Sequence, residues 1–385
     1  MRADPLDQRL RAAAGVVSPG CVALGLRGGE LRYLGVAGTL ASHAAAGALT
    51  DVAVDEDTRY DLASLTKVLS TTTLVAQSVA EGRLALDDAL PDPLAPADGP
   101  APRLAELLEH AAGLAAHREY FHAPWSLAVN QPEAMLAAIR ATARDCPPQT
   151  RAIYSDLGFI LLGRWLELVH ERPLDALFHE RVAEPLGLAG AIGFRRISAS
   201  TEAPADSSKR PIAPTEVYDA ALHGGARQHW YAIRETLGQG MAHGVVHDDN
   251  CLVLDGVGGH AGLFGTAAAV AAIGQAWLDG LPLVARERHP ELLARFSQPS
   301  RVAGSTRRLG FDGQDPSGGG STGGALSPAS FGHLGFTGTS LWIDPAPSAR
   351  SVHVLLTNRV HPSRGDAGLG IRALRPQVHR LLAAR

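Results

Sequence analysis

The chain is organised around the stretch Asp61-Leu-Ala-Ser-Leu-Thr-Lys-Val68. Ser64 and Lys67 stand three residues apart at the start of a helix predicted over residues 64–81. Positions i and i+3 share one face of a helix, so the serine hydroxyl and the lysine amine are expected to lie side by side. A hydroxyl becomes a good nucleophile when a base takes its proton, and a lysine can be that base if burial or a nearby cation lowers its pKa.

Lysine is scarce in this protein. The chain contains 35 Lys and Arg residues together, and Lys occurs only at Lys67 and Lys209. Arg stays protonated in proteins, whereas Lys can lose its proton. A lysine at this spacing, in a chain that supplies positive charge almost entirely with arginine, indicates amine chemistry. The alternative is an ordinary amphipathic helix with a solvated lysine.

Composition indicates a globular protein with a substantial core. The chain has 385 residues, of which 45% are hydrophobic and 19% charged, and a formal net charge of −4. No basic face argues for a nucleic-acid partner. Cys21, Cys146 and Cys251 are widely separated, odd in number and without a C-x-x-C pair, which favours reduced thiols. The first residues carry no basic-then-apolar segment and no stretch is apolar enough to span a bilayer, so we expect a cytoplasmic protein.

Strand signals lie at both ends of the chain, with helix signals between them. A hairpin is predicted where Gly28-Gly29 separates two apolar runs. This order predicts an α/β lobe of the α+β type from residues 1–90 and 240–385, with a mainly helical lobe inserted at 91–239. Further helices are predicted over residues 1–15, 104–112, 130–145, 157–170, 174–183 and 371–384, and strands over 339–344 and 351–358.

Two further segments stand out beside Ser64-Leu-Thr-Lys67. Tyr154-Ser155-Asp156 precedes the apolar helix, and Gly332-His-Leu-Gly-Phe-Thr-Gly-Thr339 precedes the first C-terminal strand. In this order, the three segments resemble the Ser-x-x-Lys, Tyr-x-Asn and Lys/His-Thr-Gly motifs of the superfamily of class C β-lactamases, D-alanyl-D-alanine peptidases and serine esterases. The resemblance covers nearly the whole chain. It implies a β-lactamase-like fold, with an antiparallel sheet flanked by helices and the site in the cleft between the two lobes.

The resemblance also implies a role for each motif residue. Ser64 would attack a carbonyl, with Lys67 and Tyr154 as the base system, and which of these two carries the proton stays open. The backbone amides of Ser64 and Phe336 would form the oxyanion hole. His333 would occupy the Lys/His position on an edge strand and face the pocket opposite Lys67.

Two positions depart from the family pattern. Asp156 stands where the family has Asn, and a carboxylate can only accept hydrogen bonds, so near Lys67 it could form a charged pair. Leu334 replaces the usual Thr and removes a hydroxyl that would bind a substrate carboxylate, while the motif keeps Gly335, which we count with the substrate-binding residues. Both changes argue against β-lactam or peptidoglycan substrates and leave the nucleophile, base and oxyanion hole intact.

Other local patterns lack the context that their chemistry requires. Gly319-Gly-Ser-Thr-Gly323 matches the esterase elbow, but it lies in a Gly-rich stretch with no strand before it and no helix after it. The pairs His117/His122 and His243/His247 have no His-Glu-x-x-His pattern and no evident third ligand, so no metal is expected. His260, within Gly-His-Ala-Gly, is interpreted as a structural loop residue.

We therefore predict a serine hydrolase that forms an acyl-enzyme on Ser64 and acts on an ester or small amide, without cofactor. The alternatives are a β-lactamase or D-amino-acid peptidase, a transacylase, and a non-catalytic binding protein on the same fold. The expected partner is a small ester, amide or lactam. Specificity is assigned to the loops at 115–130, 195–230 and 300–330, which have no readable pattern, and the sequence predicts no oligomeric state.

Overall fold

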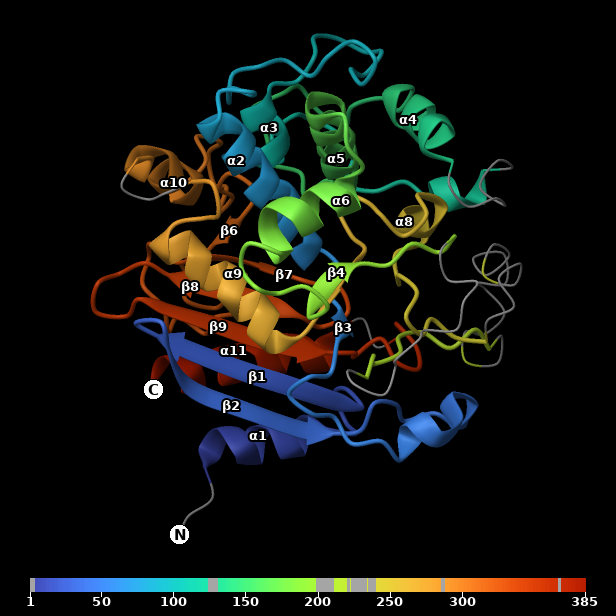
Figure 1. Cartoon of the computed structure of the whole chain (residues 1–385), viewed down its shortest axis with the longest axis vertical. Helices are drawn as coiled ribbons and strands as arrows, with labels where there is room; N and C mark the ends of the chain where they lie inside the picture. Colours follow the sequence, from blue (N-terminus) through green and yellow to red (C-terminus); the bar gives the residue numbers. More distant parts are fainter. Residues whose placement is uncertain are drawn as a thin grey trace.

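The chain forms a large antiparallel sheet with helices on both faces, and a mainly helical part lies beyond one of these faces (Figure 1). The predicted fold class is confirmed, whereas the boundaries of the two lobes stay a prediction. Lys209 and most of the predicted loop at 195–230 lie outside the described residues. The computed structural model describes residues 4–123, 131–198, 211–219, 222, 234, 240–284, 288–365 and 368–385.

The large sheet is built from both ends of the chain. Its strands are β1 (Gly20–Arg27), β2 (Glu30–Gly38), β6 (Asp312–Gly313), β7 (Phe331–Leu334), β8 (Ser340–Asp344) and β9 (Ser351–Thr357). Their order is β2-β1-β9-β8-β7-β6, and every neighbouring pair is antiparallel. Gly28 and Gly29 have φ angles of +61° and +82° in the predicted hairpin turn. The expectation that His333 lies on an edge strand is wrong, because β6 pairs with β7 outside it.

Helices cover both faces of this sheet. The helices α1 (Pro5–Ala13) and α11 (Leu369–Ala383) pack on one face, and α9 (Ala267–Asp279) packs on the other (Figure 1). Successive strand residues point to opposite faces. Cys21 therefore lies in the cluster with α1 and α11, whereas Val22 lies in the larger core with α9.

The predicted helix at 64–81 is present and begins directly after Ser64. Its first part is the π-helical segment η2 (Lys67–Thr72), which continues as α2 (Thr73–Ala80) and ends before Gly82, where φ is +70°. All residues of η2 are buried, because the helix passes between the sheet and the helical part of the molecule. A π turn inside a helix often marks a functional site.

The remaining elements are η1 (Ala44–Thr50), α3 (Leu104–Leu108), η3 (Tyr120–His122), α4 (Pro132–Arg140), α5 (Asp156–His170), α6 (Leu174–Phe178), η5 (His179–Ala183), α8 (Asp249–Val253), α10 (Pro290–Ser297) and a small sheet of β3 (Tyr60–Asp61), β5 (Leu263–Gly265) and β4 (Ile192–Phe194). Of these, α5, α10 and η5 contact the central helix. The sequence pattern did not predict α8, α9, α10 or the small sheet. Helix α9 is apolar on most sides, so no helical period marks it. No helix in the described part of the chain is long and apolar enough to cross a membrane.

Candidate active site

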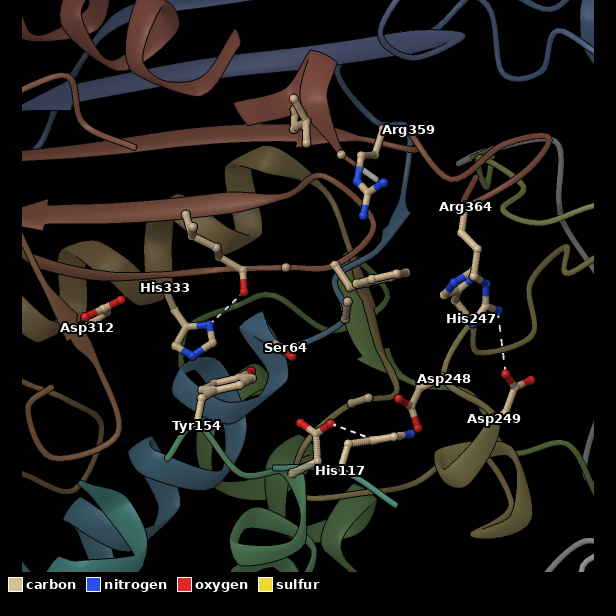
Figure 2. Close-up of a pocket in the computed structure, with 18 of the residues that line it drawn as sticks. Ser64, His117, Tyr154, His247, Asp248, Asp249, Asp312, His333, Arg359 and Arg364 are labelled. Carbon is tan, nitrogen blue, oxygen red and sulfur yellow. Dashed lines mark hydrogen bonds and ion pairs between the residues drawn. The ribbon is translucent and has the colours of Figure 1, made fainter. Parts of the chain in front are cut away.

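Ser64 follows a strained turn at the end of β3. The carboxylate of Asp61 accepts a hydrogen bond from the Ala63 N–H at 2.8 Å. Ala63 has a φ of +47°, in the left-handed region that costs a non-glycine residue about 1–2 kcal/mol. Strain of this kind is often found at functional positions. The turn places Ser64 at the start of the central helix and on the wall of a cavity (Figure 2).

Lys67 lies one helical turn further along, with a fully buried side chain. Its Nζ donates to Ser64 Oγ at 3.1 Å and to Asp156 Oδ1 at 2.7 Å. A third contact reaches the backbone carbonyl oxygen of His260 at 3.3 Å. An ammonium has three hydrogens to donate, so these three acceptors fix its position. The structure thus brings together Ser64, Lys67 and Asp156, and shows that His260 holds the lysine through its backbone.

The charge pair between Lys67 and Asp156 determines the protonation of the site. Burial lowers the pKa of Lys67, but Asp156 and Tyr154 outweigh burial and raise it to about 12. Burial acts in the opposite sense on Asp156, yet Lys67 and His117 hold the pKa of this carboxyl well below its usual range. The lowered pKa that would make Lys67 a ready base at neutral pH is therefore not found. At neutral pH the lysine is an ammonium, because a carboxylate occupies the position of the family's amide.

Tyr154 and His333 lie next to each other (Figure 2), and the Nζ of Lys67 lies 4.9 Å from the centre of the Tyr154 ring. Burial raises the pKa of Tyr154, while Lys67 opposes this effect without cancelling it. The centre of the His333 ring lies 5.6 Å from that of Tyr154, and the guanidinium of Arg307 lies 4.9 Å from the tyrosine ring. Burial, followed by Lys67 and Arg307, holds the pKa of His333 well below its ordinary value. The imidazole is therefore neutral, and its Nδ1–H donates to the Leu334 carbonyl oxygen at 2.8 Å.

His117 connects the buried charge pair to the outside of the protein. Its Nδ1 lies 3.2 Å from Asp156 Oδ2, and 41% of its side chain is exposed. This hydrogen bond raises the pKa of His117 against the effect of burial. His122, which the sequence places five residues away, lies with its Nε2 3.3 Å from Glu119 Oε2. His117 thus belongs to the site through Asp156, and no motif pointed to this contact.

Threonine side chains fasten the β7–β8 turn to the segment that carries Ser64. Thr337 Oγ1 donates to the carbonyl oxygen of Asp61 at 2.7 Å, and Thr339 Oγ1 donates to that of Leu62 at 3.1 Å. A Cβ on Gly335 would lie 1.9 Å from Thr339 Oγ1, so this position requires glycine.

The two amides predicted for the oxyanion hole lie on the segments that these threonines join. Within the described chain, neither the Ser64 N–H nor the Phe336 N–H donates to a protein acceptor. Both residues line the same cavity. The two N–H groups are therefore available to a ligand.

The cavity has a volume of about 750 Å³ and two chemically different ends. Ser64, Tyr154 and His333 lie at one end, and His247, Arg359 and Arg364 lie at the other (Figure 2). Phe336 belongs to the second end. Its surface is 50% exposed, its ring stacks on that of His247 at 5.6 Å, and the guanidinium of Arg359 lies 4.8 Å from it. The remaining lining residues are Ala63, His117, Glu119, Phe121, Asp156, Asp248, Asp249, Ala261, Arg307, Asp312, Leu334, Gly335, Gly368, Ile371, Arg372 and Arg375.

Replacing Asp156 with asparagine should shift the pH dependence of serine acylation towards lower pH. Asp156 raises the pKa values of both Lys67 and Tyr154, so the variant loses a proton from this pair more easily. A shift of about one pH unit corresponds to a tenfold larger deprotonated fraction at neutral pH. The rate of fluorophosphonate labelling between about pH 6 and about pH 10, which lie close to the ordinary pKa values of histidine and lysine, measures the shift.

Asp145→Asn is the matched control, because Asp145 pairs with Arg118 at 3.1 Å and does not line the cavity. Its profile should coincide with that of the wild type. An unchanged profile in the Asp156 variant, or a shift to higher pH, would contradict the assignment of Asp156 as the group that keeps Lys67 and Tyr154 protonated.

The fold and the site define the class of protein, a serine hydrolase of the β-lactamase fold. The β-lactamase family profile matches residues 6–375, and the chain belongs to this family. A protein of Escherichia coli O157:H7 named putative D-alanyl-D-alanine carboxypeptidase is 29% identical in an alignment of 325 residues, and the match covers 80% of this chain and 71% of the relative.

Solved structures show the same fold. A penicillin-binding protein homologue from Caulobacter crescentus has a TM-score of 0.68 at 21% identity, and the match covers 98% of this chain and 95% of that one. EstCE1, described as a hydrolase with promiscuous acyltransferase activity, has a TM-score of 0.66 at 21% identity, with 96% and 98% of the two chains covered. At this level of identity, the similarity supports the fold alone.

Proposed function

We propose that the protein is a serine hydrolase that forms an acyl-enzyme on Ser64 and acts on small esters or amides. The observation that supports this proposal most strongly is the 3.1 Å hydrogen bond between Ser64 Oγ and the buried Nζ of Lys67 at the wall of the cavity. A hydroxyl on a strained turn, beside an amine without solvent contact, has the geometry of an activated nucleophile.

In the reactive form of this proposal, Lys67 has lost a proton and is a neutral amine, while Tyr154 keeps its hydroxyl proton. Ser64 Oγ attacks the substrate carbonyl and gives its proton to the neutral amine of Lys67. The Tyr154 hydroxyl then protonates the leaving group, and proton transfer from the ammonium to the phenolate restores the pair. Because the pKa of Lys67 is raised to about 12, this form is a minority at neutral pH, and acylation should become faster as the pH rises.

The tetrahedral intermediate would carry its negative charge towards the N–H groups of Ser64 and Phe336. Two preorganised amides stabilise such an oxyanion in a partly enclosed site. His333 is neutral, so it does not supply a second cation beside Tyr154 as a lysine would. Water then attacks the acyl-enzyme, and Tyr154 and Lys67 transfer the protons in the reverse order to release the acid and restore Ser64.

Arg307 favours a second candidate, a carboxypeptidase that acts on D-amino-acid peptides. Its guanidinium lines the cavity beside Tyr154, and its ion pair with Asp312 is long at 3.6 Å. In this candidate, Arg307 binds the substrate carboxylate. Leu334 lacks the hydroxyl with which the family's usual threonine would do so. The name of the Escherichia coli relative is consistent with this candidate.

A substrate screen separates the two candidates. The protein is assayed with p-nitrophenyl esters of increasing chain length, with nitrocefin, and with an N-acylated D-alanyl-D-alanine dipeptide. We expect the uncharged short esters to be turned over fastest. Rapid nitrocefin hydrolysis would contradict the preference for esters, and release of D-alanine at a higher kcat/KM than ester hydrolysis would establish the carboxypeptidase.

Arg307→Gln provides the internal control of this screen. It should lower kcat/KM only for substrates that carry a carboxylate, by about tenfold or more for a lost charge-assisted hydrogen bond. Equal losses on charged and uncharged substrates would remove the role of Arg307 in carboxylate binding.

A further inference from the structure

Arg375 reaches the active site from the C-terminal helix α11. Its side chain is buried, with a relative exposure of 7% for the residue. Its Nη2 donates to the carbonyl oxygens of Gly335 and Thr339 at 2.7 Å and 2.8 Å. These carbonyls belong to the two ends of the β7–β8 turn, which also carries Phe336. A cation from the last helix therefore holds the turn that contributes one of the two predicted oxyanion donors.

The contact to Gly335 has a particular consequence for Phe336. The carbonyl of Gly335 and the N–H of Phe336 belong to the same planar peptide unit, and in a trans peptide they point in opposite directions. A cation that binds the carbonyl oxygen withdraws electrons from the unit and makes the N–H a stronger donor, because linked hydrogen bonds polarise one another. Arg375 thus binds the carbonyl end of the peptide whose N–H, at Phe336, donates to no protein acceptor in the described chain.

Given the proposed serine hydrolase function, we infer that Arg375 is a positioning residue that orients and polarises the Gly335–Phe336 peptide for oxyanion stabilisation. The residue touches neither the nucleophile nor the substrate carbonyl in this role, and it acts through the peptide. It links the C-terminal helix to the chemistry of Ser64.

The charge environment of Arg375 supports the same conclusion. No carboxylate in the described ranges lies within ion-pair distance of this guanidinium. Burial, followed by the neighbouring Arg359 and Arg372, lowers its pKa to about 9. A buried cation without a counter-ion is costly. The negative charge that develops on the substrate oxygen during acylation would reduce this cost, and would do so only in the transition state.

A purely structural role would predict different behaviour. An arginine that only fastens a turn would affect stability and the fraction of correctly folded protein, without changing the chemistry of each intact site. Arg308 offers a matched comparison, because it is also buried, with 5% exposure, and donates to the backbone carbonyls of Pro328 and Ser330 at 3.0 Å and 3.1 Å. Arg308 does not line the cavity.

The experiment compares Arg375→Gln, Arg375→Lys and Arg308→Gln with the wild type. The readouts are kcat and KM for p-nitrophenyl butyrate, the Ki of phenylboronic acid, and Tm, with active sites counted by fluorophosphonate titration. Phenylboronic acid forms a tetrahedral anion on a reactive serine and so reports on oxyanion stabilisation. We expect Arg375→Gln to lower kcat per titrated site by about tenfold, less than the 10²–10³ for loss of a whole oxyanion donor.

The expected pattern has three parts. Arg375→Gln should raise the Ki of phenylboronic acid by the same factor by which it lowers kcat, and it should leave KM unchanged. Arg375→Lys should recover most of both losses, because it keeps the positive charge. Arg308→Gln should lower Tm without changing either quantity.

Three outcomes would overturn the inference. These are an unchanged kcat and Ki per titrated site in Arg375→Gln, equal losses in Arg308→Gln, and no recovery in a folded Arg375→Lys variant. Should Arg375→Gln fail to fold, Arg375→His decides at about pH 8, where an ordinary histidine keeps one N–H donor and is mostly neutral. About tenfold weaker phenylboronic acid binding than in the wild type would support the inference, whereas unchanged affinity would leave Arg375 only the role of fastening the turn. Absence of fluorophosphonate labelling in the wild type would instead overturn the proposed function itself.

Discussion

Replacing Ser64 with alanine should abolish fluorophosphonate labelling and lower ester turnover by about 10⁴-fold or more. The variant lacks the oxygen that accepts the Lys67 hydrogen bond and forms the acyl bond. The oxyanion donors and the cavity stay in place, so substrate binding should persist while turnover is lost. Intact mass spectrometry after labelling, followed by peptide mapping, measures the modification, and p-nitrophenyl ester hydrolysis measures turnover.

Ser321→Ala is the control for this prediction. Ser321 stands in the Gly-x-Ser-x-Gly pattern of residues 319–323, which the structure shows as turns with neither a preceding strand nor a following helix, and it does not line the cavity. This variant should keep wild-type labelling and turnover. Labelling of the Ser64 variant at the wild-type level, or loss of activity in the Ser321 variant alone, would assign the nucleophile to another serine.

The features predicted correctly from the sequence depend on local geometry. The spacing of Ser64 and Lys67 fixes their proximity because one turn of helix brings them together, whatever surrounds it. The hairpin at Gly28-Gly29 follows from backbone conformations that glycine adopts without strain. Asp156 could be expected near Lys67 once the two motifs were aligned with a family, and its ion pair at 2.7 Å agrees with that expectation.

The features that the sequence did not predict depend on contacts between distant segments. The sign of the Lys67 pKa shift depends on the balance between burial and two partners from another part of the chain. His117 and Arg375 reach the site from a loop and from the last helix, and no motif surrounds either of them. Helix α9 escaped prediction because its burial on most sides removes the polar face that a periodic pattern needs.

Replacing Lys67 with arginine should lower the rate of acylation by about 10³-fold or more while the protein still folds. Arginine keeps the positive charge next to Asp156 but cannot lose its proton, so the reactive form proposed for the site cannot arise. The lysine is also fully buried, and its Nζ is held by three acceptors. A planar guanidinium cannot place one nitrogen at all three distances.

The rate of fluorophosphonate labelling under single-turnover conditions measures this loss, and thermal unfolding checks that the variant is folded. Lys209→Arg is the matched control, since it is the same substitution at the chain's other lysine and should leave the rate unchanged. Should a folded Lys67→Arg variant keep more than about a few per cent of the wild-type rate, a fixed cation would suffice at this position. The proton of Ser64 would then have to pass to Tyr154. Asp156 would serve to keep Lys67 positively charged, and it would not set the pKa of the base that activates Ser64.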